Sequence, residues 1–180
     1  MTELNGWNIE AMNKAIDGVK EQPEAGKLTW RSRVDWDSGY GLDVRTREIK
    51  QLGQVIQRPF TLRGDHPPEL LGNNTGPTAV EILMSALGAC MAGTFAAQAT
   101  AHGIRIKNLK LDLESMMDLN GMFGLKPIRP GLFNVKLLYH LDSDADISEL
   151  KEILNEVKSL SPVFDSVTKP AKVDVHLNKV

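Results

Sequence analysis

The chain contains one cysteine, Cys90, which lies in the most apolar stretch of the sequence. A thiolate is a strong nucleophile, but a free thiol with a pKa near about 8.5 is mostly protonated at neutral pH. Reactivity toward peroxides would therefore require another group that stabilises the thiolate. The alternative is that Cys90 packs as a small hydrophobic side chain, which is common for free cysteine. The residue alone leaves both interpretations open.

An arginine from a neighbouring strand could stabilise a Cys90 thiolate, and Glu81 could orient that arginine through a bidentate pair. Arg45 and Arg47 are the candidates, although a solvated strand face explains them equally simply. Glu81 precedes Cys90 by nine residues, which is a rotation of about 180° on a straight helix. We therefore expect Glu81 to act through an intermediary or to serve the other subunit's site in a dimer.

The remaining composition favours a cytoplasmic protein without a metal or another cofactor. The four histidines lack the spacing of metal ligands, and a single cysteine excludes an intramolecular disulfide and suits a reducing compartment. The net charge is −2 with both signs mixed along the chain, so neither a nucleic acid nor an anionic membrane is expected as a partner. The N-terminus does not have the layout of a signal peptide. The histidines are His66, His102, His140 and His176.

The segment around Cys90 is predicted to be one long helix. Thr78 and Glu81 form a capping-box pattern at its start, and Gly103 is suited to end it in a left-handed conformation. The helix is apolar on every side, so every side should be buried. A helix of about 25 residues is hard to bury in one small domain, and pairing of two such helices in a dimer would cover the exposed side.

The other segments predict an α+β fold. An amphipathic helix over residues 5–20, capped by Asn5 or Asn8, forms an appendage spanning residues 1–26. A period of two then predicts strands, and a second amphipathic helix over 146–160 has Asp146 as its cap and ends at Ser161 and Pro162. The expected architecture is a mostly antiparallel sheet around two helices, in one domain spanning residues 27–180. The strands are expected at 28–36, 42–46, 55–62, 104–113 (irregular at Asn108), 133–141 and 173–177.

Several sequence segments resemble the OsmC/Ohr-type proteins in their order and spacing. They are Asp65–Gly72 (DHPPELLG), Gly76–Leu83 (GPTAVEIL), Ala86–Cys90 (ALGAC), Asp118–Leu125 with Arg129–Gly131, and Ser161–Asp165 (SPVFD). The resemblance implies an intertwined homodimer with two active sites at the subunit interface. It also implies thiol-dependent reduction of organic hydroperoxides by a cysteine on the central helix. That cysteine would work with a resolving cysteine after the second helix, an arginine and a glutamate.

Carried over onto this sequence, Cys90 matches the reactive cysteine and Glu81 a glutamate of the preceding motif. Ser161 stands where peroxidase members have the resolving cysteine. The segment Gly39-Tyr40-Gly41 has no arginine, which leaves Arg45 or Arg47 for that role. The resemblance is thus to a single-cysteine branch in which an external thiol would regenerate Cys90.

The competing function is a non-catalytic dimer that binds an apolar small molecule at the subunit interface. The connection over residues 116–125 is rich in methionine and phenylalanine. Such polarizable side chains could line an adaptable pocket, or they could form a lid over the core.

Overall fold

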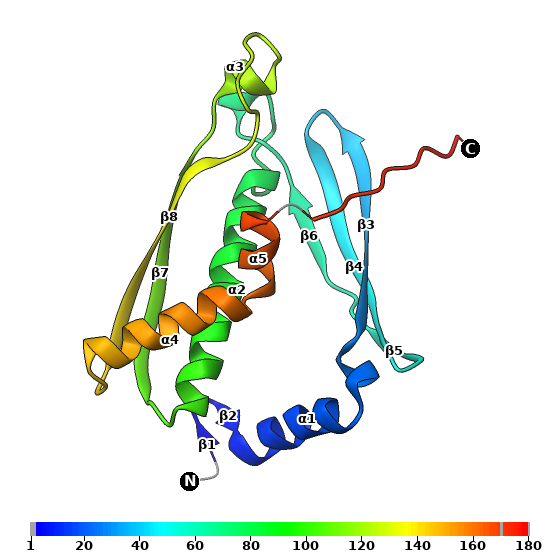
Figure 1. Cartoon of the computed structure of the whole chain (residues 1–180). Helices are drawn as coiled ribbons and strands as arrows, with labels where there is room; N and C mark the ends of the chain where they lie inside the picture. Colours follow the sequence, from blue (N-terminus) through cyan, green and yellow to red (C-terminus); the bar gives the residue numbers. More distant parts are fainter. Residues whose placement is uncertain (1–2, 170, 180) are drawn as a thin grey trace. The chain divides into compact units, whose positions relative to one another are not determined.

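The computed structural model describes residues 3–169 and 171–179 (Figure 1). The chain divides into two compact units, Met1–Ser85 and Ala86–Val180, and the boundary falls within the long helix α2 (Ala79–Ala101). The predicted limits of the appendage and of the single domain over residues 27–180 remain predictions.

The first unit begins with a two-stranded ladder, β1 (Glu3–Leu4) and β2 (Trp7–Asn8), followed by α1 (Ile9–Glu21) and a 3-10 turn, η1 (Pro23–Gly26). The Asn8 side chain accepts a hydrogen bond from the backbone N–H of Ala11 at 2.9 Å, so Asn8 is the helix cap. Asn5 instead lies in the turn, with a φ of 52°. None of the residues of α1 is fully buried, and Ile16 and Val19 of its apolar stripe are exposed.

A four-stranded antiparallel sheet follows, built from β3 (Leu28–Ser38), β4 (Gly41–Gln51), β5 (Gln54–Gln57) and β6 (Thr61–Gly64). β4 pairs with all three other strands. The predicted strand over residues 55–62 is therefore two strands. Pro59 lies at the break, because proline cannot donate to a strand ladder. The chain then passes through η2 (Pro68–Leu70) into α2.

The second unit combines an antiparallel hairpin with helices. It contains β7 (Ile106–Met116), α3 (Leu119–Met122), β8 (Phe133–Ser143), α4 (Ile147–Leu160) and α5 (Pro162–Thr168). β7 and β8 run alongside α2 (Figure 1), and their register shifts between Ile106 and Asn108, which confirms the predicted irregularity. Residues of alternate positions on both strands, among them Leu111 and Leu137, pack against the core.

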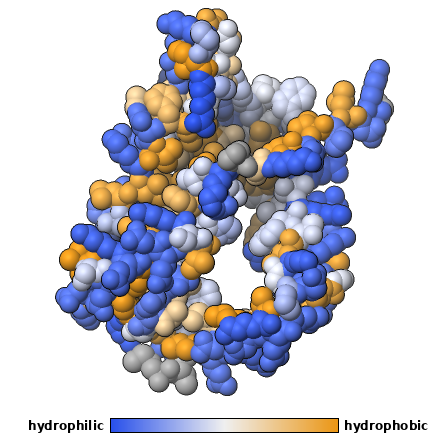
Figure 2. All heavy atoms as spheres, in the orientation of Figure 1, coloured by the Kyte–Doolittle hydropathy of each residue, from blue (hydrophilic) through white to orange (hydrophobic). Residues whose placement is uncertain are grey.

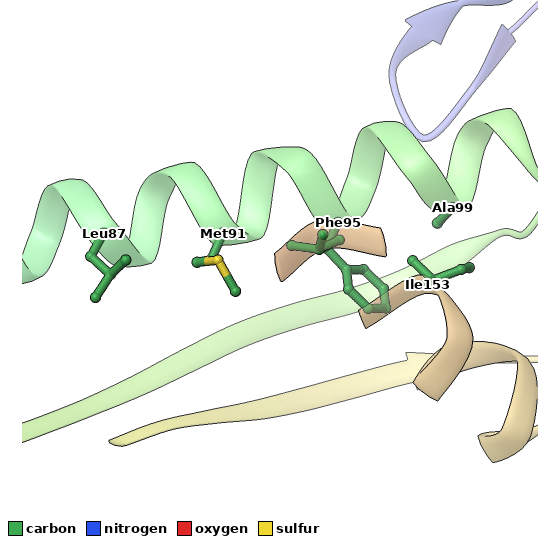
Figure 3. Packing of buried hydrophobic residues seen from close by; sticks show 6 residues of the cluster. Leu87, Met91, Phe95, Ala99 and Ile153 are labelled. Atoms are coloured by element: carbon green, nitrogen blue, oxygen red, sulfur yellow. The ribbon is translucent and has the colours of Figure 1, made fainter. Parts of the chain in front are cut away.

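The core of this unit is a stripe along α2 whose members recur every four residues. Figure 3 shows Leu87, Met91, Phe95 and Ala99 on one side of the helix, with Ile153 of α4 close to Phe95. All five are at most 3% exposed. The spacing of four residues keeps the side chains on one face, and this face meets α4, β7 and β8.

Three expectations require correction. The strands form separate antiparallel ladders rather than one sheet. Only some of the residues of α2 are buried, and Leu83 remains 43% exposed, so one chain does not enclose the helix on every side. Residues 171–179 form no strand, because a strand needs a neighbour for its backbone hydrogen bonds and no other described strand pairs with this segment.

The C-terminal segment nevertheless keeps the alternation of a strand. Val173, Val175 and Leu177 are 77%, 87% and 97% exposed, and Figure 2 shows hydrophobic residues in the open along this segment. Its sequence is therefore that of a strand, but no strand among the described residues pairs with it.

By length and composition, α2 could cross a membrane. The core helix of a soluble protein can pass the same test, and one stripe of α2 packs in the core of the second unit.

Candidate functional site

Cys90 lies half-buried on α2, and Ser161 is its hydrogen-bond partner. The Ser161 hydroxyl donates to the Cys90 sulfur at 3.1 Å, and Ser161 is completely buried. Two residues distant in sequence thus meet inside one unit.

Two helix ends hold Ser161 in place. Its backbone N–H donates to the Val157 carbonyl at 2.9 Å at the end of α4, and its hydroxyl accepts from the Phe164 N–H at 3.3 Å at the start of α5. Pro162 occupies the first turn of α5, where proline is well tolerated. Pro162 therefore ends α4 as predicted but also begins a second helix, which the sequence reading missed.

A hydroxyl aimed at sulfur has a direct chemical effect. The hydroxyl gives the Cys90 sulfur one protein hydrogen-bond donor. Ser161 has no sulfur with which to form a disulfide. The geometry therefore provides Cys90 with a hydrogen-bond donor but with no resolving thiol at this position.

Tyr139 on β8 is a further polar group of the second unit, and the sequence analysis treated it only as an apolar strand residue. Its ring lies 5.4 Å from the Phe95 ring, between centroids. Among the described residues, the Tyr139 hydroxyl is the buried side-chain group that lacks a hydrogen-bond partner. Leaving a buried polar group unpaired costs about 1–3 kcal/mol. The signal in the sequence was a tyrosine among the inward-facing aliphatic residues of β8.

The environment also keeps Tyr139 protonated. Burial raises its pKa to about 12, and the negative charge of a Cys90 thiolate contributes to the rise. The hydroxyl is therefore a hydrogen-bond donor throughout the physiological pH range.

Glu81 forms the predicted capping box at the start of α2. Its carboxylate accepts from the Thr78 backbone N–H at 2.7 Å, and the Thr78 hydroxyl accepts from the Glu81 N–H at 3.2 Å. The hydrogen bonds from Thr78 lower the pKa of Glu81. Glu81 belongs to the first unit and Cys90 to the second, so a catalytic role for Glu81 remains a prediction.

The two predicted arginines lie on exposed parts of β4. Arg45 pairs with Asp35 at 2.8 Å and with Asp43 at 3.4 Å. Arg47 is exposed, and no described acidic side chain forms an ion pair with it. Both belong to the first unit, so their pairing with Cys90 also remains a prediction.

A third arginine, which the sequence reading missed, lies at the β3–β4 hairpin. The Arg63 guanidinium donates to Asp37 at 3.0 Å and to Asp43 at 3.3 Å, and the hydrogen bond that it donates to Asp37 is the largest cause of its raised pKa. A Cβ atom on Gly41 would lie only 2.6 Å from Arg63 Nη2. An arginine side chain from β6 thus occupies the space beside the arginine-free segment around Tyr40. In the sequence, the sign of this arrangement was the glycine at position 41, which leaves room for a side chain from another strand.

The connection over residues 64–77 is organised by Asp65, which is buried. Its carboxylate accepts hydrogen bonds from the backbone of His66, Asn73 and Thr75 and from the Thr75 hydroxyl. These bonds, with that from the Thr75 hydroxyl largest, lower the pKa of Asp65 to about 2. An anion-binding role for this loop is disfavoured, since an internal carboxylate already uses these donors.

Metal binding has little support in the described part of the chain. No group of three potential ligand side chains occurs there. Two of the histidines have carboxylate neighbours instead: His102 contacts Glu156 at 3.0 Å and His140 contacts Asp112 at 2.7 Å.

A groove of about 370 Å³ lies between β8 and α4 in the second unit. Its lining is mainly apolar and includes Phe95, Tyr139 and Leu150, and Lys151 is its charged member. Such a groove could hold an apolar molecule. The methionine- and phenylalanine-rich connection does not line it; Met116, Phe123 and Leu125 are exposed.

Comparison with known proteins identifies a family model and solved structures that are similar to this chain. Residues 72–176 match the family model described as OsmC-like protein. An OsmC-like protein from Mycoplasma pneumoniae has a TM-score of 0.60 at 21% identity, covering 80% of this chain and 89% of its own. A Legionella pneumophila structure, described as an organic hydroperoxide resistance protein OsmC and predicted redox protein, has a TM-score of 0.53 at 14% identity over 77% and 88%.

A third similar structure is a putative organic hydroperoxide resistance protein from Vibrio cholerae, with captopril bound in one of its active sites. Its TM-score is 0.54 at 13% identity, over 78% of this chain and 85% of its own. A comparison with curated proteins found no match. At these identities the structures establish the fold, an OsmC/Ohr-like α+β architecture.

Proposed function

The chain belongs to the OsmC-like family, and on this premise we propose that it reduces organic hydroperoxides with the single reactive residue Cys90. The observation that carries the proposal is the hydrogen bond from the buried Ser161 hydroxyl to the Cys90 sulfur. The names of the Legionella and Vibrio structures, which refer to organic hydroperoxide resistance, support the same chemistry.

In the proposed reaction, the Cys90 thiolate attacks one oxygen of the hydroperoxide. A sulfur–oxygen bond forms, the oxygen–oxygen bond breaks, and the departing alkoxide takes up a proton to leave as an alcohol. Cys90 is then a sulfenic acid, which condenses with a thiol to release water. Ser161 cannot supply that thiol, so an external thiol forms a mixed disulfide and a second thiol releases reduced Cys90.

The charged groups of the proposed site come from the first unit. Arg45 and Arg47 remain candidates, and Arg63 joins them because it fills the space beside Gly41. A guanidinium near sulfur would stabilise the thiolate. Glu81 would orient that arginine, in its own subunit or in the partner.

A homodimer is part of the proposal, and unpaired apolar surfaces support it. On β3, Trp30, Val34 and Trp36 are 70%, 57% and 73% exposed, and a strand face of this kind is normally covered. Leu83 on α2 and the alternating residues of the C-terminal segment are exposed as well. A second copy would cover these surfaces.

The oligomer can be tested on β3. Light scattering after gel filtration should report a dimer for the wild type and a shift toward monomer for Trp30→Glu. Thr29→Glu, on the opposite face of the same strand, is the matched control and should stay dimeric. A stable wild-type monomer would contradict this part of the proposal.

The chemistry is tested by intact mass spectrometry after one equivalent of cumene hydroperoxide, with and without a dimedone trap for sulfenic acid. We expect a trapped adduct on the wild type and none on Cys90→Ser. Consumption of peroxide should continue only with added thiol. The absence of any Cys90 adduct would refute the peroxidase proposal.

The groove between β8 and α4 favours a second candidate, the binding of an apolar small molecule without catalysis. Cys90 would then be a packing residue without a role in catalysis. Under this alternative Cys90→Ser binds a fluorescent apolar probe as tightly as the wild type, whereas Leu150→Glu in the groove weakens binding.

We propose a cytoplasmic location and neither nucleic-acid nor membrane partners, in keeping with the mixed charge along the chain.

A further inference from the structure

A cavity of about 310 Å³ lies on the four-stranded sheet of the first unit, and three arginines line it. They are Arg33 on β3 and Arg45 and Arg47 on β4, and the acidic residue of the lining is Glu48. A volume of this size is at the lower end of sites that hold small molecules. All the lining residues belong to the first unit.

The pairing of the strands brings the three guanidinium groups together. Arg33 lies directly opposite Arg45 in the β3–β4 ladder, and Arg45 lies opposite Thr61 of β6, another lining residue. Arg47 follows Arg45 by two positions, so both side chains point to the same face of the sheet. Like charges that lie directly opposite each other on neighbouring strands are destabilising. A bound anion would relieve this repulsion.

The nearby carboxylates only partly neutralise these arginines. Arg33 and Arg45 share one carboxylate, that of Asp35, each at 2.8 Å. The second contact of Arg45, to Asp43, is longer at 3.4 Å. Arg47 forms no ion pair with an acidic side chain in the described part of the chain. Its guanidinium is therefore available to a ligand.

The charge of the whole sheet has the same sign. Glu48 is already paired with Arg31 at 3.3 Å. Between Leu28 and Gly64 the sequence contains seven lysine and arginine residues and four acidic ones, a surplus of three positive charges. The complete chain has a net charge of −2, so positive charge is concentrated on this sheet.

We propose that this cavity binds the phosphate group of a phosphorylated small molecule. A guanidinium presents two parallel N–H donors that match the oxygens of a phosphate, and a phosphate monoester carries a charge of about −1.5 to −2 at neutral pH. The organic part of the ligand would lie against Pro59 and Phe60, which also line the cavity. This site goes beyond the reduction of hydroperoxides and does not require Cys90.

The same face disfavours an extended polyanion such as a nucleic acid. Asp35 and Asp43 lie opposite each other in the ladder, next to the pair formed by Arg33 and Arg45. A row of phosphates along the strands would meet these carboxylates and be repelled, whereas a single phosphate can lie among the arginines alone.

The test is isothermal titration calorimetry of the wild-type protein with phenyl phosphate at constant ionic strength. Phenyl sulfate, a monoanion of similar shape, is the matched ligand and should bind about tenfold more weakly, because it carries about half the charge. Inorganic phosphate should also bind more weakly, because it makes no contact with Phe60. Equal affinity for inorganic and phenyl phosphate would overturn the proposal of an organic ligand.

Two variants locate the site. Arg33→Gln and Arg47→Gln should each weaken the binding of phenyl phosphate about tenfold, the effect of one hydrogen bond to a charged group. Arg47→Gln removes no ion pair, so it should unfold at the wild-type urea concentration. Lys50→Gln removes a charge from β4 outside the cavity and is the matched control. It should bind within about twofold of the wild type, since solvent and salt screen a charge that does not touch the ligand.

Three results would overturn the inference. They are the absence of saturable binding of phenyl phosphate, equal weakening by Lys50→Gln and Arg47→Gln, and tighter binding of a single-stranded oligonucleotide than of phenyl phosphate. Cys90→Ser should bind phenyl phosphate like the wild type, and loss of binding in this variant would contradict a site independent of the thiol. If phenyl phosphate binds but Cys90 yields no sulfenic acid, the proposed function fails and this site stands.

Discussion

The contact between Ser161 and Cys90 leads to a quantitative prediction for Ser161→Ala. The substitution removes two interactions of a completely buried hydroxyl. Loss of the N-terminal cap of α5, where the hydroxyl accepts from Phe164, costs about 1 kcal/mol. Loss of the donated bond to Cys90 costs about 0.5–1.5 kcal/mol. The free energy of unfolding should therefore fall by about 1.5–2.5 kcal/mol.

Urea unfolding of the reduced protein measures this change. Ser166→Ala is the matched control, because Ser166 lies in the same helix, is exposed, and bonds only within α5 to the Pro162 carbonyl at 2.8 Å. Exposed substitutions of this kind usually stay within about 0.5 kcal/mol. Equal stability of the two variants would refute the structural reasoning.

The same substitution probes the chemistry of the thiol. Under the proposed function the Ser161 hydroxyl supports the reacting sulfur, so loss of this hydrogen bond of about 1 kcal/mol should slow iodoacetamide alkylation at neutral pH about fivefold. Ser166→Ala should react like the wild type. An unchanged rate in Ser161→Ala would mean that the hydroxyl caps α5 but does not activate Cys90.

Three further predictions follow from particular contacts. Ser161→Cys should form a disulfide with Cys90 on treatment with hydroperoxide, seen by intact mass as the loss of two hydrogens; a stable sulfenic acid in this variant would contradict the geometry. Asp65→Asn should lower the Tm near neutral pH. Because the pKa of Asp65 is lowered from 3.8 to about 2, its contribution is present above about pH 4 and is lost as the pH falls toward 2, so the Tm difference from wild type should shrink over that range. Gly72→Ala should destabilise by at least about 1–3 kcal/mol, since its Cβ would lie 1.9 Å from a backbone carbonyl oxygen, whereas Gly18→Ala, with open space in α1, should not destabilise.

Local patterns predicted most of the elements. The capping boxes at Thr78 and Asp146, the left-handed Gly103 and the irregularity near Asn108 are all present, because each depends on residues a few positions apart. The helix α5, which was not predicted, also depends on neighbouring residues. Ser161 and Pro162 end α4 and at the same time begin α5 as its cap and first residue.

Long-range pairing was predicted less well. The period of two at Val173 and Leu177 identifies a strand-like sequence, but a strand forms only where another edge accepts its hydrogen bonds. No such edge is used in the described single chain. Similarly, the apolar sequence of α2 predicts that the helix is buried, but it does not predict which elements cover each face. In the described structure, neighbouring elements bury one stripe of the helix.

The sequence by itself determined the family resemblance, the position of Cys90 within a long helix, and the absence of a second thiol, because these are properties of residue type and local spacing. Only the tertiary structure decided what surrounds Cys90. It brings the Ser161 hydroxyl to the sulfur across seventy-one positions, turns the Tyr139 hydroxyl into an unpaired buried donor, and places Arg63 beside Gly41. Those contacts depend on how helices and strands pack, and no local pattern encodes the distance between side chains that are far apart in the chain.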